Sequence, residues 1–183
     1  MKKIMMAVAL AACVSPAFAQ KYMTRTGKIT FFSATPLENI EAFNNESAAV
    51  VDGTTGDVAF QVPIKSFKFE KELMQEHFNE NYMESDKYPK AEFKGKLAAP
   101  ASVNYSKDGT YNVKVSGKLT IHGVTKDVAV PGTIVIKDGT ATLNTKFMVK
   151  PGDYGIKIPA VVKGKIAEQI AVTVNSVLKA LQK

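Results

Sequence analysis

The sequence contains no tryptophan, a single cysteine and two histidines among its 183 residues. The cysteine, Cys13, lies in the N-terminal segment. If that segment is removed, the remaining chain has no cysteine, which excludes disulfides, catalysis by a thiolate and metal sites with cysteine ligands. A zinc or transition-metal site needs several converging ligands. His77 and His122 lie alone, without a His-x-His or His-Glu-x-x-His spacing. His122 follows an alternating segment at its outward parity, which predicts a surface histidine at the end of a strand. The sequence therefore predicts no metal site.

Arginine is almost absent: Arg25 is the only one, although the formal net charge is +7. Nucleic-acid-binding proteins usually gather arginine, lysine and aromatic residues on one face. Here the lysines are scattered over polar positions of alternating segments, where lysine is a common choice for a solvated or edge-protecting residue. We therefore expect no nucleic-acid partner. No later run approaches the ~20 apolar residues of a membrane span.

Catalytic patterns are missing as well. No serine lies in a Gly-x-Ser-x-Gly elbow, and no glycine-rich phosphate loop precedes a helix. The glutamates between residues 72 and 84 fit the solvated side of a helix rather than a pair of catalytic carboxylates. The sequence therefore predicts no catalytic residues, and we expect a protein that is not an enzyme.

The N-terminus carries an export signal. Lys2 and Lys3 precede an apolar stretch over residues 4–14, and Ala17-Phe18-Ala19 forms a small-x-small cleavage site. This is the pattern of a secretory signal peptide over residues 1–19. We therefore expect one domain over residues 20–183, located in the periplasm or cell envelope.

Period-2 alternation runs through most of the remaining chain, as in residues 111–121, where apolar and polar residues exchange at every step. Short turns with Asp-Gly or Pro-Gly separate the alternating segments. The pattern predicts an all-β fold, an antiparallel barrel or sandwich. Closing about eight strands into a barrel leaves an interior that is either packed with side chains or holds one small ligand.

One segment breaks the alternation. Between about residues 70 and 85, Leu73, Phe78 and Tyr82 recur near helical spacing, and Pro89 then ends any helix. We expect a short helical insertion here. It could act as a cap or gate over the barrel interior.

Two motifs in this chain resemble the YceI-like family of exported lipid-binding proteins. The first is "MQEHFNENYMESDKYPKAEFKGKL", in which an acidic-His helix and an aromatic loop lead through Lys-Tyr-Pro into a strand. The second is "GKLTIHGVTKDVAVP", and the closing "KFMVKPGDYGIKIP" is similar to the last loop of the family. Two departures are Met74-Gln75, where the family often has Arg-Asp, and Tyr82-Met83, where it often has Phe-Phe.

The resemblance implies an extended, lipocalin-like antiparallel β-barrel that holds a polyisoprenoid, an isoprenoid quinone or another long-chain amphiphile, with no other cofactor. Inward strand positions then become candidate wall residues, and the helix and loops become the candidate mouth. The expected wall residues are Phe31, Phe60, Phe93, Leu119, Ile121 and Phe147. The expected gate residues are His77, Phe78, Tyr82, Met83 and Tyr154.

Two alternatives remain open at this point. The barrel could be solidly packed and serve as a structural, interaction or stress-related protein of the envelope. It could also be an envelope enzyme acting on a lipid, with His77 or the Asp153-Tyr154 pair in acid-base roles. The sequence does not fix the oligomeric state, and a homodimer is one option.

The signal peptide has a competitor that a mass measurement separates from it. Leu10-Ala11-Ala12-Cys13 also fits a lipoprotein box, in which Cys13 would be acylated and become the first residue, but its apolar stretch is short. We expect mass analysis of the exported protein to give a first residue of Gln20 and no acyl chain. A lipid-modified mass beginning at Cys13 would contradict this prediction.

Overall fold

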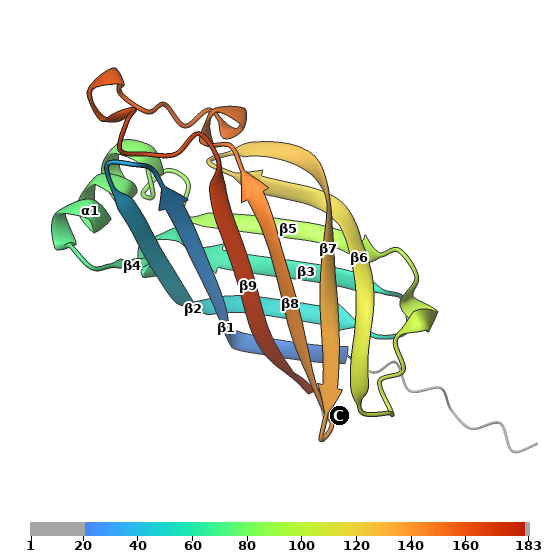
Figure 1. Ribbon diagram of the computed structural model, residues 1–183. Coiled ribbons are helices and arrows are strands. Elements are labelled where there is room, and N and C mark those ends of the chain that lie inside the picture. The colour runs from blue at the N-terminus through green and yellow to red at the C-terminus, as the bar shows by residue number, and fades with distance from the viewer. Residues whose placement is uncertain (1–20, 182–183) are drawn as a thin grey trace, which may run out of the picture.

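The computed structural model describes residues 21–181 (Figure 1). The expected signal peptide and Cys13 lie outside the described residues. Within residues 21–181, no helix has the length and apolar character needed to cross a membrane.

Eight long antiparallel strands form one closed barrel. Strand β1 pairs with β2 on one side and with β9 on the other, and each remaining strand pairs with its neighbours around the wall. A two-residue strand, β4 (Lys68–Phe69), pairs only with β2. The expected all-β, lipocalin-like barrel of about eight strands is confirmed. The eight strands are β1 (Lys21–Ala34), β2 (Asn39–Asp52), β3 (Asp57–Pro63), β5 (Lys90–Leu97), β6 (Gly109–Ile121), β7 (Val124–Lys137), β8 (Thr140–Val149) and β9 (Ile170–Ala180).

The helical insertion lies between β3 and β5, where the loss of alternation places it. It contains α1 (Glu72–His77), which continues as a π-helical turn, η2 (Phe78–Tyr82). Four short 3₁₀ turns are found elsewhere: η1 (Ile64–Ser66), η3 (Pro100–Ser102), η4 (Pro151–Tyr154) and η5 (Ala160–Val162). The expected short helix is confirmed, and it lies at one end of the barrel (Figure 1).

Two facing glycines let β5 and β6 approach closely. Gly95 pairs with Gly117, and a Cβ atom on Gly117 would collide with the backbone of Lys94 and Gly95. A Cβ atom on Gly95 would lie 2.6 Å from Cζ of Phe93, so the Phe93 ring covers the bare backbone of Gly95. Glycines of this kind allow a sheet to bend sharply, and a neighbouring aromatic ring restores the lost packing.

The end of the barrel opposite α1 is solidly packed. Tyr22 of β1 and Tyr105 of the β5–β6 loop stack with ring centroids 5.0 Å apart. Val51, Ile136 and Leu178 are buried in the same cluster. These side chains fill the barrel here, so any ligand space must lie toward the other end.

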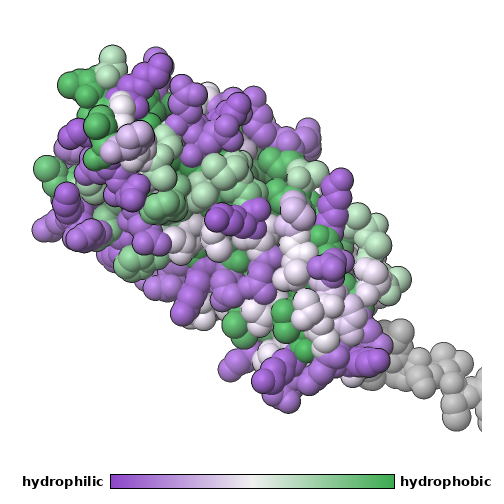
Figure 2. Space-filling view, viewed as in Figure 1, coloured by the Kyte–Doolittle hydropathy of each residue, from purple (hydrophilic) through white to green (hydrophobic). Residues whose placement is uncertain are grey.

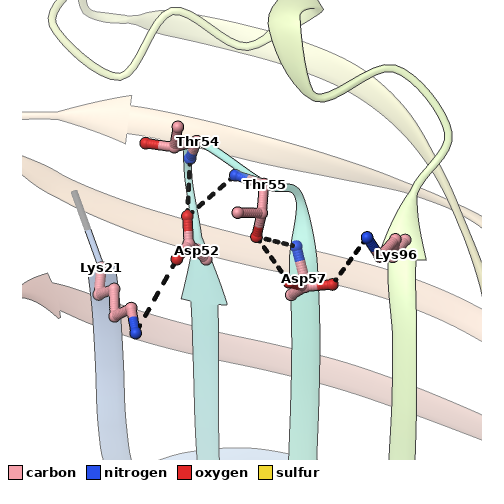
Figure 3. A network of polar contacts seen from close by, with 6 residues as sticks. All are labelled: Lys21, Asp52, Thr54, Thr55, Asp57 and Lys96. Carbon is pink, nitrogen blue, oxygen red and sulfur yellow. Dashed lines mark hydrogen bonds and ion pairs between the residues drawn. The ribbon is translucent and has the colours of Figure 1, made fainter. Parts of the chain in front are cut away.

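A polar network fixes the strand ends around this packed end (Figure 3). The Asp52 carboxylate accepts hydrogen bonds from the backbone N–H groups of Thr54 and Thr55 at 2.9 and 3.0 Å, and Lys21 Nζ lies 4.0 Å from it. The hydrogen bond from Thr55 is the main reason that the pKa of Asp52 is below its ordinary value. The Thr55 hydroxyl also donates to Asp57, which pairs with Lys96 at 3.3 Å. The network therefore ties β1, β2, β3 and β5 in register.

The stacked tyrosines predict a loss of stability in alkali. Burial raises the pKa of Tyr105 to about 12 from an ordinary value of 10.0, with a further contribution from Tyr22. At a pH between these two pKa values, the Tyr105 hydroxyl ionises in the unfolded chain but stays neutral in the folded protein. The free energy of unfolding therefore falls as the pH rises. The Tyr105 hydroxyl has no hydrogen-bond partner among the described residues. We expect Tyr105→Phe to make the alkaline loss shallower in denaturant titrations, with unchanged or higher stability at neutral pH.

Tyr111→Phe is the matched control for this prediction. The Tyr111 hydroxyl donates to the Lys107 carbonyl at 3.0 Å, so its removal should lower stability by about 0.5–1 kcal/mol. A clear loss of stability in Tyr105→Phe at neutral pH would contradict the prediction.

Candidate functional site

A cavity of about 510 Å³ occupies the half of the barrel on the α1 side. Its wall comes from inward positions of all eight barrel strands, because alternate residues of each strand face the interior. Exposed residues also line it, including Lys71, Leu73 and Lys165, so the cavity reaches the surface at this end. We call this opening the mouth.

The structure places all six expected wall residues on the cavity surface. They come from five strands, and each has the inward parity read from the sequence. Their role as ligand contacts stays a prediction. The six are Phe31, Phe60, Phe93, Leu119, Ile121 and Phe147.

Four of the five expected gate residues also line the cavity, namely His77, Phe78, Tyr82 and Met83. His77 is exposed at the end of α1, whereas Met83 is buried. The fifth, Tyr154, lies outside the cavity lining. Its side chain is buried at 4% exposure, packed beside the barrel wall.

Four phenylalanine rings join the insertion to the barrel at the mouth. Phe78 lies 5.4, 5.6 and 5.1 Å, between ring centroids, from Phe31, Phe67 and Phe69. Aromatic pairs at such distances stabilise each other beyond the apolar area that they bury. Phe67 and Phe69 are not among the residues expected from the sequence, because the turn η1 shifts the strand parity by one residue after Ile64. The alternation in "FKFE" is the signal that could have indicated them.

The barrel wall is incomplete between β7 and β8. Their ladder stops at the pair Gly132–Thr145, and residues 124–131 of β7 pair only with β6. No backbone hydrogen bond of the described turns and loops reaches residues 124–131. Beyond the ladder, β8 contacts this stretch through the Thr145 hydroxyl, which donates to the Pro131 carbonyl at 2.7 Å. The cavity lining includes Asn144, whose outward-facing side chain also accepts a hydrogen bond from Asn175. The two strands therefore separate over the upper half of the barrel (Figure 1).

The segment after β8 fills this split. Tyr154 and Ile156 are buried in one cluster with Val124 of β7 and Val149 of β8. Burial raises the pKa of Tyr154, and the neighbouring Asp153 adds to the shift. We call residues 151–158 the wedge, because their side chains replace strand pairing between β7 and β8. This position explains why Tyr154 seals the wall instead of lining the cavity.

His122 connects the wedge to the insertion. Its Nδ1 atom lies 3.2 Å from the carbonyl oxygen of Tyr154, and its Nε2 atom lies 2.7 Å from Oε2 of Glu84. The Tyr88 ring packs edge-on against the imidazole at 4.5 Å. The sequence interpretation of His122 as a surface histidine is wrong, since its side chain is only 11% exposed. The side chains that bury it lie 34 residues earlier, at Tyr88, and 32 residues later, at Tyr154. The local sequence pattern around His122 does not reveal contacts over such distances.

Both partners of this contact have strained backbones. His122 has φ +50° and Glu84 has φ +43°, in the left-handed region that non-glycine residues rarely adopt. His122 and Gly123 form the tight turn between β6 and β7, and a Cβ atom on Gly123 would lie 2.6 Å from the Tyr88 ring. Such strain persists only where surrounding contacts hold it.

The lining is suited to binding an apolar molecule and offers little for catalysis. Phenylalanine, valine, isoleucine and leucine dominate it. The charged residues Glu38, Lys71 and Lys165 lie at the mouth, and the remaining one, Glu92, pairs with Lys90 at 3.0 Å. Among the described residues, no group of three or more His, Cys, Asp or Glu residues could hold a metal ion. The arrangement can enclose an apolar chain and leave a polar end near solvent.

The His122 contacts predict a specific destabilisation. His122→Asn keeps a residue type that tolerates the left-handed region but removes the contacts to Glu84 and Tyr154. We expect the unfolding free energy to fall by about 1–3 kcal/mol, with faster amide exchange in residues 84–88 and 151–156. His77→Asn, at an exposed position, is the control and should change stability by less than about 0.5 kcal/mol. Equal losses in the two variants would contradict this prediction.

The model of the YceI-like domain matches residues 15–178 of this chain. No match was found among curated proteins. Among solved structures, a polyisoprenoid binding domain from Saccharophagus degradans is similar, with a TM-score of 0.77 at 14% identity, covering 88% of this chain and 98% of that chain.

Two further structures have the same fold. Burkholderia cenocepacia BcnA gives a TM-score of 0.70 at 19% identity, covering 82% of this chain and 95% of that chain. The Campylobacter jejuni YceI protein gives 0.59 at 18% identity, covering 78% and 85%. With the family model matching nearly the whole described barrel, this chain belongs to the family of YceI-like domain proteins.

Proposed function

We propose that this protein is a non-enzymatic binding or carrier protein of the cell envelope. It holds an isoprenoid-type or other long-chain amphiphilic lipid inside the barrel. The observation that carries the proposal is the apolar cavity of about 510 Å³, which falls in the usual range of small-molecule sites, about 300–1,000 Å³.

The chemistry of the wall favours a hydrocarbon chain. An isoprenoid tail makes no hydrogen bonds, so its affinity must come from apolar area removed from water, about 25 cal/mol per Å² before the costs of binding. The six wall residues provide such area, and Met83 can adapt to an irregular chain. The polar end would lie at the mouth, near His77, Lys71 and Lys165.

The comparisons support the same ligand class without identifying the ligand. The similar Saccharophagus degradans structure is described as a polyisoprenoid binding domain. At 14% identity this likeness supports the fold, and the ligand of this chain remains our proposal. Residues 1–19 have the pattern of a secretory signal, which supports a periplasmic or envelope location.

The two alternatives are less consistent with the geometry. A solidly packed barrel would lack a cavity of this size. An acid-base role for Asp153 and Tyr154 would require them to face the ligand, and neither lines the cavity. His77 does line it, so His77→Ala with unchanged lipid binding and unchanged phenotype would remove the remaining enzymatic candidate.

Native mass spectrometry of the protein purified from its own host, followed by lipid extraction, is the direct measurement. We expect a bound long-chain lipid, and uptake of geranylgeraniol by the delipidated protein. Val113→Phe places a ring in the cavity and should weaken this uptake about tenfold or more, equivalent to ~1.4 kcal/mol. Asn112→Phe, on the exposed outer face of the same strand, is the matched control and should bind normally.

Protein that repeatedly emerges without lipid, and takes up neither a prenol nor an isoprenoid quinone, would contradict the proposal. Equal affinity of Val113→Phe and Asn112→Phe would show that the ligand binds elsewhere.

A further inference from the structure

We propose that the mouth of the barrel docks onto an anionic lipid bilayer through residues 156–166, which we call the docking loop, together with Leu37. This inference rests on the proposed function, because a lipid-carrying cavity needs a route between the bilayer and its interior. It adds a partner surface that the cavity alone does not specify.

The first observation is the position of the exposed apolar side chains. The three most exposed large apolar residues are Val161 at 89%, Leu37 at 73% and Leu73 at 60%. They come from three segments far apart in sequence, and all three belong to the mouth end of the barrel. Figure 2 shows apolar atoms bordered by hydrophilic ones at this end of the molecule. Exposed apolar groups gathered in one place mark interaction surfaces more often than scattered ones do.

Contacts hold the docking loop beside Leu37 and over the cavity. A Cβ atom on Gly164 would lie 3.1 Å from Cδ1 of Leu37. The backbone N–H of Ala167 donates to the Ser33 hydroxyl at 2.9 Å, which attaches the end of the loop to β1. Val162, Lys165 and Ile166 line the cavity. The loop is therefore part of the mouth itself.

The second observation is charge. The docking loop, "IKIPAVVKGKI", contains three exposed lysines, Lys157, Lys163 and Lys165, and no acidic residue. None of these lysines forms an ion pair with a described carboxylate. Apolar side chains flanked by lysines fit the boundary between headgroups and acyl chains of an anionic bilayer.

The opposite side of the mouth has the opposite charge. Leu73 lies on α1, where the four glutamates Glu70, Glu72, Glu76 and Glu80 outnumber the single neighbouring lysine, Lys71. An anionic surface would repel this side. The charge difference therefore orients the barrel, with the docking loop against the bilayer and α1 turned away from it.

Vesicle sedimentation of the exported protein tests the inference. Phosphatidylglycerol–phosphatidylethanolamine vesicles should bind at least about tenfold more tightly than phosphatidylcholine vesicles, and added salt should weaken the binding. Since each lysine at an anionic surface contributes about fivefold, Lys157→Glu/Lys163→Glu should lower affinity more than tenfold. Val161→Asp should also weaken binding.

Two matched controls keep the test specific. Lys107→Glu/Lys137→Glu makes the same charge change at the packed end of the barrel and should keep vesicle affinity within about twofold. Val177→Asp makes the same change as Val161→Asp at an exposed valine on the outer face of β9, and it should also keep vesicle affinity. Equal binding to the two kinds of vesicle, or equal losses in the controls and the docking-loop variants, would overturn the inference.

A second measurement separates this inference from the proposed function. Val161 and Lys163 do not line the cavity, so their variants should take up geranylgeraniol in vesicle-free solution like the unmodified protein. Normal prenol uptake without vesicle binding would overturn the docking surface alone. Charge-selective vesicle binding without prenol uptake would support docking and overturn the lipid-binding proposal.

Discussion

Strand β1 pairs with β2 along one edge and with β9 along the other, and this double pairing makes the sheet a closed wall. Closure fixes which side chains face inward, because the two faces of each strand alternate. It also leaves a central space that the inward side chains must fill or leave open. The molecule has a different solution at each end of this space. Side chains fill one end of the barrel interior, and the other end holds a cavity that opens to the surface.

The two ends differ in how their chain segments are held. At the packed end, Tyr22 and Tyr105 stack inside the barrel while Asp52 and Asp57 join four strands outside it. At the mouth, the insertion and the wedge pack against the barrel through side chains, and the β7–β8 ladder ends halfway up the wall. A closed end that is stabilised independently allows the other end to keep a cavity without loss of the fold.

Much of this could be predicted from sequence, since period-2 alternation directly reports the inward face of a regular strand. Phe60, Leu119 and Phe147 lie on the cavity surface at the parity that alternation indicates. The same reasoning failed where a local irregularity shifts the parity, as at η1 before Phe67. It also failed for His122, and it does not apply to Tyr154, which was a gate candidate through the family resemblance. The positions of both residues depend on packing between segments more than 30 residues apart. Such packing leaves no periodic signal in a single sequence.

The loss of strand pairing above Gly132 also determines which parts of the wall can move. Strands joined by a full ladder cannot separate without breaking several hydrogen bonds, whereas the wedge is held by apolar packing and by the contact of His122 with the Tyr154 carbonyl. The same imidazole contacts Glu84, directly after η2 and the buried Met83. The wedge and the insertion therefore share one polar contact. Displacement of either segment would disturb the other, so any widening of the cavity for a bulky chain would involve the two together.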